Sequence, residues 1–144
     1  MSKYTVHTDG GSRGNPGQAA IGVVIEGDTI GKKEYGESIG VATNNVAEYQ
    51  AVIFALKKLK QLIGGEGIEK SQVVFYMDSE LLVKQLNHEY KVKEEGIQKL
   101  FLEVHNLKLD FGKIEFKHVL RGKNMNADKM VNQVLDSEAN KLDL

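Results

Sequence analysis

The chain has 144 residues, of which 41% are hydrophobic and 27% are charged, a composition typical of one water-soluble globular domain spanning residues 1–144. Its formal net charge of −1 excludes a broadly basic protein, so any contact with a polyanion must be local. The absence of cysteine excludes a disulfide framework and a thiolate metal site. No apolar run reaches about 18 residues and no apolar leader stands at the start, so we expect a cytoplasmic protein without membrane contact.

Strand-like patterns dominate the start of the chain. Polar and apolar residues alternate in the first segment, and β-branched residues are frequent in the second. With a third segment they predict an antiparallel meander of strands over Lys3–Asp9, Ala19–Glu26 and Ile30–Ile39. A helix is predicted next over Asn44–Ile63, and because it is apolar on much of its circumference we expect it to be well buried.

The second half of the chain alternates strands with helices. The segment Gln72–Met77 is nearly continuous in apolar character, which is typical of a central strand in a parallel sheet. Helical spacing and alternation then predict helices over Ser79–Leu86 and Glu94–Lys108, a strand over Lys113–Leu120 and a helix over Met125–Ala139. A right-handed crossover through the first helix would place the fourth strand parallel to the first, so we expect an α/β fold.

Two aspartates stand where predicted strands end. Asp9 ends the first strand in TDGG, and Asp78 follows the fourth strand in MDSE. If those strands are parallel neighbours about 4.8 Å apart, their carboxyl ends lie at the same edge of the sheet, where open α/β sheets bind ligands. The glycines after Asp9 predict a sharp turn at that point. Each aspartate taken alone is also a common turn residue.

Two further carboxylates lie in predicted helices. Glu48 falls beside the apolar stripe of the long helix, and Asp128 falls in the first turn of the last helix. Separately, they are explained as a helix-surface glutamate and as an acid favoured by the helix dipole by about 0.3–1 kcal/mol. If all four acids meet, their charges repel and raise one another's pKa values. Cations such as Mg²⁺ or Mn²⁺ would remove that repulsion, and two such ions about 3.5–4 Å apart stabilise in-line phosphoryl displacement.

Four segments carry a family resemblance: TDGGSRGNPG, TNNVAEYQAVIFAL, MDSELLVKQL and HVLRGKNMNADKMVNQVLD. In this order they resemble the type 1 ribonuclease H family, and in particular its short prokaryotic and archaeal forms. The match runs from Tyr4 to Asp136. The resemblance implies a ribonuclease H-like five-stranded mixed sheet of order 3-2-1-4-5, with strand 2 antiparallel to the rest and helices on both faces.

The resemblance also implies an activity. The family hydrolyses the RNA strand of RNA–DNA hybrids with two divalent ions, Mg²⁺ or alternatively Mn²⁺, and leaves 5′-phosphate and 3′-hydroxyl ends. By resemblance, the catalytic and metal-binding residues are the carboxylates Asp9, Glu48, Asp78 and Asp128. An RNA–DNA hybrid is the expected partner, and no obligate protein partner is indicated.

Polar residues near these acids are the expected substrate contacts. Asn15 lies in the glycine-rich segment and Asn44 and Asn45 open the long helix, positions where asparagine also serves as a turn former or N-cap. By resemblance these asparagines meet the minor groove of the hybrid, where the 2′-hydroxyl distinguishes RNA from DNA. By the same resemblance, Thr43 helps to hold a DNA-strand phosphate near the helix N-terminus, and Glu48 also accepts a hydrogen bond from a ribose hydroxyl.

The chain departs from the family in the loop before the last aspartate. Many members carry a histidine there, whereas no histidine lies between His118 and Asp128 in this chain. Arg121, Lys123 or solvent could replace the missing group in product release. We interpret His118 itself as a structural residue of the fifth predicted strand.

The chain also lacks the lysine-rich insertion that some members carry after the helix following Asp78. The connecting loop offers only His88, Lys91 and Lys93, which are either solvated or contact the DNA strand. We therefore expect modest, salt-sensitive binding of hybrid.

Three other functions are compatible with parts of the sequence. The fold could bind hybrid without cutting it, serve another metal nuclease such as an integrase or a junction resolvase, or be purely structural. The presence of all four carboxylates favours cleavage over binding alone. The TNN and GNPG segments favour recognition of a ribose over the integrase and resolvase alternatives. A purely structural protein would not need an aspartate at two strand ends.

Overall fold

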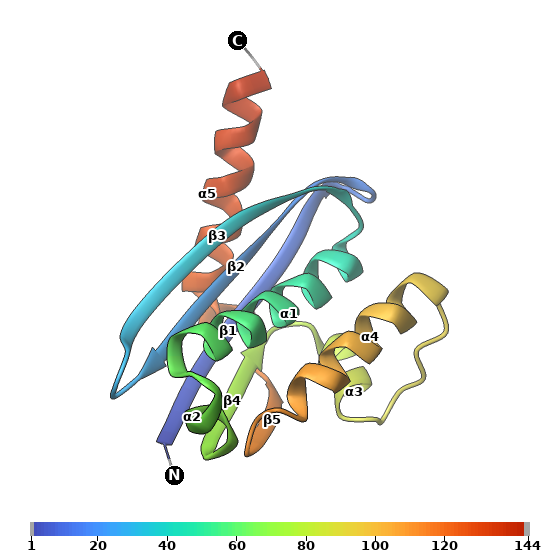
Figure 1. Ribbon diagram of the computed structural model, residues 1–144. Coiled ribbons are helices and arrows are strands. Elements are labelled where there is room, and N and C mark those ends of the chain that lie inside the picture. Colours follow the sequence, from blue (N-terminus) through green and yellow to red (C-terminus); the bar gives the residue numbers. More distant parts are fainter. Residues whose placement is uncertain (1, 143–144) are drawn as a thin grey trace.

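The structure is a computed structural model that describes residues 2–142, with side chains described through residue 141. Strands and helices alternate along this range (Figure 1). The elements are β1 (Ser2–Gly14), β2 (Gly17–Gly27), β3 (Gly31–Ala42), α1 (Asn44–Ile63), α2 (Gly65–Glu69), β4 (Ser71–Met77), α3 (Glu80–Leu86), α4 (Glu95–Lys108), β5 (Lys113–His118), the 3₁₀ turn η1 (Arg121–Lys123) and α5 (Met125–Leu142).

The strands form a five-stranded sheet in the order β3-β2-β1-β4-β5. β2 pairs antiparallel with β1 and β3, whereas the pairs β1–β4 and β4–β5 are parallel. The predicted order and the antiparallel direction of the second strand are therefore confirmed. The order also makes β1 and β4 neighbours, which is the condition for Asp9 and Asp78 to meet.

Helices cover both faces of the sheet (Figure 1). α1 crosses one face over β1 and β2 and packs against α4, while α5 lies on the other face over β2, β1 and β3. The larger core lies between the sheet and α1, where Val6, Phe75 and Leu56 are completely removed from water. Burying one such side chain contributes about 1.5–3 kcal/mol to folding. A smaller cluster joins α5 to the sheet and comprises Ala20, Val131 and Leu135.

The bounds of α1 are those predicted, because both of its ends are strongly marked. The hydroxyl of Thr43 at the N-cap accepts a hydrogen bond of 3.3 Å from the backbone N–H of Val46. At the other end Gly64 adopts a φ of 86°, which glycine reaches without a Cβ penalty. Most apolar positions of α1 are buried, as the sequence predicts, and the others are partly buried against the core.

The predicted turn directly after Asp9 is wrong. β1 continues from Asp9 to Gly14, and this extension pairs in register with Gly17–Gly22 of β2. The chain reverses at Asn15 and Pro16, which are joined by a cis peptide bond. Local composition in this stretch is typical of a turn, but the extended conformation is fixed by pairing with a strand that comes later in the chain. β2 and β3 are also longer than predicted.

Two short helical segments, α2 and η1, are absent from the sequence-based prediction. Each is about one turn long, so neither shows a helical repeat, and α2 contains two glycines. β5 ends at His118 rather than Leu120, and α5 continues to Leu142 rather than ending at Ala139. His118 does belong to β5, but its side chain is exposed and adds nothing to the core.

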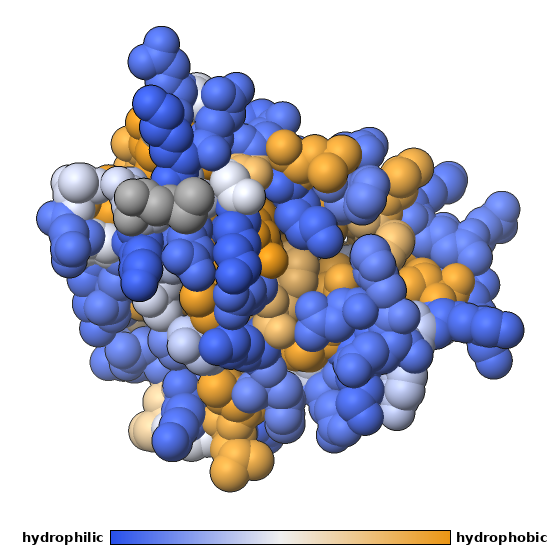
Figure 2. Space-filling model, turned by 90° about the horizontal axis from the view of Figure 1, so that it is seen from below, coloured by the Kyte–Doolittle hydropathy of each residue, from blue (hydrophilic) through white to orange (hydrophobic). Residues whose placement is uncertain are grey.

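Hydrophilic residues predominate on the face of the molecule that Figure 2 shows. Viewed from the end where β1 begins, apolar atoms reach the surface only in scattered patches (Figure 2). Between residues 2 and 142, none of the helices combines the length and the apolar character needed to cross a lipid bilayer.

Candidate active site

Asp9 and Asp78 stand side by side on neighbouring parallel strands. His7 of β1 pairs with Tyr76 of β4, and the two rings stack with centroids 5.1 Å apart. Each aspartate follows one of these residues at the same spacing, Asp9 within β1 and Asp78 directly after Met77 at the end of β4. Because side chains alternate between the faces of a sheet, the two carboxylates extend to the same face as the stacked rings.

Two glycines beside Asp9 allow helices to approach this point from both sides. A Cβ atom on Gly10 would overlap the backbone of Ala47 in α1. A Cβ atom on Gly22, the register partner of Asp9, would overlap the backbone of Ala127 in α5. Each helix therefore lies directly on the sheet. The residues that follow Ala47 and Ala127 are Glu48 and Asp128. The close approach therefore places the backbone of Glu48 beside Gly10 and brings Asp128 to Asp9.

Asp9 meets two other aspartates in this arrangement. Burial is the largest cause that raises the pKa of Asp9 to about 8, followed by the negative charges of Asp78 and Asp128. A hydrogen bond shared with the Asp128 side chain raises the pKa further, whereas the backbone N–H of Gly10 acts in the opposite direction. These interactions place Asp9, Asp78 and Asp128 within one electrostatic cluster.

Glu48 joins the same cluster through Asp78. Burial raises the pKa of Glu48 to about 7, and the charge of Asp78 adds to the increase. The hydroxyl of Ser79 partly offsets both effects by favouring the charged carboxylate. The structure therefore brings together all four carboxylates that the sequence singles out, on β1, α1, the end of β4 and the first turn of α5.

Two asparagines hold carboxylates of the cluster in place. The buried amide of Asn124 donates to the backbone carbonyl of Thr8 at 2.8 Å and, at 3.5 Å, to Oδ2 of Asp78. Asn132 donates to Oδ2 of Asp128 at 3.3 Å. The sequence analysis does not single out either asparagine. The helical spacing between Asp128 and Asn132 is a signal that could have found the second, whereas Asn124 acts through contacts between distant elements.

The predicted substrate residues gather at the N-terminus of α1. The side-chain oxygen of Asn44 accepts from the backbone N–H of Ser12 at 2.9 Å, and the backbone N–H of Asn44 donates to Oδ1 of Asn15 at 3.1 Å. These bonds join the β1–β2 hairpin to the start of the helix, next to the N-cap Thr43. Asn45 is separate from them and lines a pocket of about 160 Å³ with the loop between α3 and α4.

The donor set fits a hard divalent cation in its chemistry. Four carboxylates offer only oxygen ligands, the kind that Mg²⁺ and Mn²⁺ prefer. Burial, and after it the neighbouring carboxylates, raise the pKa values of Asp9 and Glu48, and a bound cation would favour the charged form of both groups. Within the described range, no three acidic or histidine side chains are already arranged as a coordination shell.

Comparison with known proteins decides the family. A family described as reverse transcriptase-like matches residues 7–134. The crystal structure of LC11-RNase H1 in complex with an RNA/DNA hybrid superimposes with a TM-score of 0.87 and 40% identity, covering 94% of this chain and 99% of that one. The chain belongs to the type 1 ribonuclease H family. Its described residues keep the sheet of that family and place the four acids at one point.

Other relatives of the family are longer than this chain. Ribonuclease HI of Halobacterium salinarum is 38% identical over 129 residues, which are 89% of this chain and 62% of that protein. The bifunctional protein Rv2228c of Mycobacterium tuberculosis is 37% identical over 140 residues, 95% of this chain but 36% of its own length. The solved N-terminal RNase H domain of the mycobacterial protein has a TM-score of 0.87 and is covered to 99%. The chain thus spans about a third of the mycobacterial relative.

Proposed function

We propose that the chain is a metal-dependent endoribonuclease that hydrolyses the RNA strand of RNA–DNA hybrids, with residues 1–144 forming one ribonuclease H-like domain. The observation that carries the proposal is the convergence of four carboxylates from distant parts of the chain on one edge of the sheet. Membership of the ribonuclease H family and the likeness to an enzyme solved with an RNA/DNA hybrid support it.

In this proposal Asp9, Glu48, Asp78 and Asp128 hold two divalent ions, Mg²⁺ or alternatively Mn²⁺. Such a pair of ions would stabilise the attacking and leaving oxygens of an in-line displacement at phosphorus, giving the 5′-phosphate and 3′-hydroxyl ends implied by the family resemblance. The protein's own part is to orient the four carboxylates. Because Asp9 and Glu48 have raised pKa values, they release protons when a cation binds near neutral pH.

The hydrogen-bonded hairpin and helix start form the proposed surface for the ribose. Asn15, Asn44 and Asn45 would meet 2′-hydroxyls in the minor groove of the hybrid, and Glu48 would accept from one of them. A DNA-strand phosphate would lie near Thr43, where the backbone N–H groups of the first turn of α1 favour an anion. Since the bonds that join Asn15 and Asn44 fix the backbone of both segments, this surface is formed before substrate binds.

The DNA strand has a second candidate contact beyond Asn45. Exposed Lys91 and Lys93 line the same 160 Å³ pocket as Asn45 and stand in place of the lysine-rich insertion of other members. Neutralisation of phosphates by such lysines supplies salt-dependent affinity.

Binding without cutting remains the second candidate function, and it is less well supported because all four carboxylates are present and clustered. The family match also disfavours the integrase and resolvase alternatives.

The proposed function is tested by cleavage of end-labelled substrates with Mg²⁺ and with EDTA. We expect cleavage of the RNA strand in a hybrid, little cleavage of double-stranded RNA, none of DNA, and no activity in EDTA. A hybrid with 2′-deoxy substitutions around the cut site should be cut more slowly. Binding of hybrid without any metal-dependent cleavage would support the binding function instead, and equal cleavage of the 2′-deoxy hybrid would remove the proposed specificity.

Recognition of ribose by asparagine is tested by replacing Asn44 and Asn45 together with alanine. The loss of bonds to ribose should cost roughly 0.5–1.5 kcal/mol per bond, so the rate on hybrid falls and the preference over the 2′-deoxy hybrid narrows. Both rates are measured in single-turnover experiments. If the rate falls while the preference stays at the wild-type value, the asparagines serve only as turn and helix-start residues.

A further inference from the structure

The face of the sheet opposite α1 is only partly covered. α5 lies over β1, β2 and β3, and the side chains that β4 and β5 direct to this face are half-buried or exposed. We define the open face by the residues that share this side of the three adjacent strands β1, β4 and β5: Lys3, Thr5, His7, Gln72, Val74, Tyr76, Lys113, Glu115 and Lys117. None of these residues belongs to the proposed hybrid surface at the start of α1.

Two aromatic rings lie side by side on the open face. His7 and Tyr76 are register partners on the central strands β1 and β4, and their rings stack at an angle of 26°. Both side chains are half-buried, so the pair keeps part of its surface accessible. Aromatic rings on the central strands of a sheet are a common platform on which bases of a single strand stack, and this stacking tolerates any base sequence.

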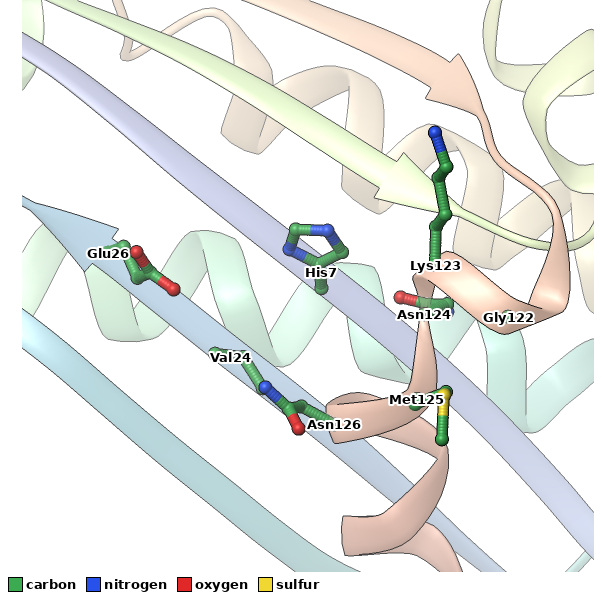
Figure 3. Close-up of a pocket in the computed structure, with 8 residues that line it drawn as sticks. All are labelled: His7, Val24, Glu26, Gly122, Lys123, Asn124, Met125 and Asn126. Atoms are coloured by element: carbon green, nitrogen blue, oxygen red, sulfur yellow. The ribbon is translucent and has the colours of Figure 1, made fainter.

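A pocket of about 210 Å³ adjoins this aromatic pair (Figure 3). His7 forms part of it, Val24 and Glu26 of β2 lie on one side, and residues 122–126 of the following loop and helix lie on the other. The wall therefore combines apolar atoms with hydrogen-bonding groups, as a site for one planar base requires. Asn124 lines the pocket and also contacts Asp78 of the carboxylate cluster, so the pocket and the cluster adjoin each other.

Lysines give the open face a local excess of positive charge. Lys113 and Lys117 both approach the carboxylate of Glu115, at 3.1 and 3.6 Å, so one negative charge is shared by two ammonium groups. Lys3 lies on the same face, and Lys123 extends outward from the wall of the pocket (Figure 3). These four lysines outnumber Glu115 and the pocket residue Glu26 by two and are complementary to a chain of phosphates, whereas the carboxylate cluster at the edge of the same face repels phosphates.

We propose that the open face binds a single strand of nucleic acid, with bases stacked on the His7–Tyr76 pair, one base in the adjacent pocket, and phosphates beside Lys117 and Lys123. This site is separate from the hybrid surface and goes beyond the proposed function. It would retain an unpaired end that emerges from the cut strand. Binding there needs neither a metal ion nor cleavage, so it can be tested even if the proposed hydrolysis fails.

The test measures the fluorescence anisotropy of a labelled single-stranded oligonucleotide of roughly twelve nucleotides as the protein is added in EDTA. Tyr76→Ala should weaken binding about tenfold because a stacking platform is lost. Lys117→Ala should weaken it less, but should lower the slope of log affinity against log salt by about 0.7 because one phosphate contact is removed. The matched control is Lys99→Ala, an exposed lysine of α4 on the opposite side of the sheet, which should bind as wild type.

The location of binding is measured by amide chemical shifts of the ¹⁵N-labelled protein during the same titration. We expect shifts in β4, β5 and residues 122–126. Shifts confined to the start of α1 and the α3–α4 loop would overturn the proposal, because the strand would then occupy the hybrid surface. Absence of binding would also overturn it. So would a dimer in sedimentation experiments, if its second copy covers the open face. If Tyr76→Ala fails to fold, the change in salt slope of Lys117→Ala tests the proposal instead, because Lys117 is exposed and its replacement leaves the core intact.

Discussion

At Asp9, the position that suits cation binding also destabilises the charged carboxylate in the metal-free fold. Asp9 is half-buried and its carboxyl group lies beside two other aspartates, which favours the protonated form in the folded protein. The same crowding would favour a cation when one is present. The sequence singles out the four acids because Asp9 and Asp78 stand at predicted strand ends, Glu48 beside an apolar stripe and Asp128 in the first turn of a helix. Asn124 could not be predicted in this way, because its role depends on two distant elements meeting its side chain.

The raised pKa of Asp9 predicts a pH-dependent loss of stability in the metal-free protein. Between its ordinary value of 3.8 and about 8, the unfolded chain has lost this proton while the folded protein keeps it, so the free energy of unfolding falls as pH rises through this window. Glu48 acts in the same direction between 4.5 and about 7. Asp9→Asn removes the larger contribution and should be more stable than wild type at pH 8 in EDTA.

Urea denaturation in EDTA at several pH values measures this difference. At pH 4 the stability of Asp9→Asn and of wild type should nearly coincide, and the gap should open toward pH 8. The control Asp28→Asn changes an exposed acid in the turn between β2 and β3 and should follow the wild-type curve. A parallel, unchanged pH dependence in Asp9→Asn would show that the acids are not crowded in the folded state.

At the scale of elements, the site depends on how closely two helices approach the sheet. The alternating and helical repeats are local, so the positions of the strands and of the longer helices follow from the sequence, whereas the strand order is implied by the family resemblance. The end of β1 does not follow from the sequence, because Gly10–Gly14 resembles a turn and is extended only through its pairing with β2. Gly10 matters because its lack of a side chain lets α1 pack closely against β1, and not because the chain turns there.

Gly22→Ala tests this dependence on close approach. The added Cβ would overlap the backbone carbonyl of Ala127, so α5 must move away and carry Asp128 from Asp9. We expect a loss of about 1–3 kcal/mol in the free energy of unfolding and a large fall in cleavage rate. Gly96→Ala in α4 is the matched control, because a Cβ there meets no other atom. Wild-type stability and activity in Gly22→Ala would refute the proposed role of this glycine.

At the scale of the whole molecule, the net charge limits the salt-dependent part of the affinity for hybrid. The net charge is −1, and the proposed hybrid surface carries only Lys91 and Lys93 as nearby lysines. We therefore expect few phosphates of a blunt hybrid to be neutralised. At about −0.9 per phosphate for duplex DNA, the slope of log affinity against log salt should be no steeper than roughly −4.

The slope is measured by titrating hybrid at several salt concentrations in Ca²⁺ or EDTA to prevent cleavage. Lys93→Ala should make it shallower by about one unit, whereas Lys58→Ala, whose ammonium group lies over the rings of Tyr35 and Phe54, should leave it unchanged. A much steeper slope in the wild type would mean that an additional basic surface contacts the hybrid.

Single-turnover cleavage of hybrid in Mg²⁺ by four single variants tests most directly whether the clustered carboxylates form one metal-dependent active site. Asp9→Asn, Glu48→Gln, Asp78→Asn and Asp128→Ala should each lose at least about a hundredfold in rate while keeping the circular dichroism of the folded protein. Asp110→Asn, which removes an exposed acid paired with Lys60, should cut as wild type. Wild-type rates in any of the four variants would contradict the assignment of that carboxylate to the active site.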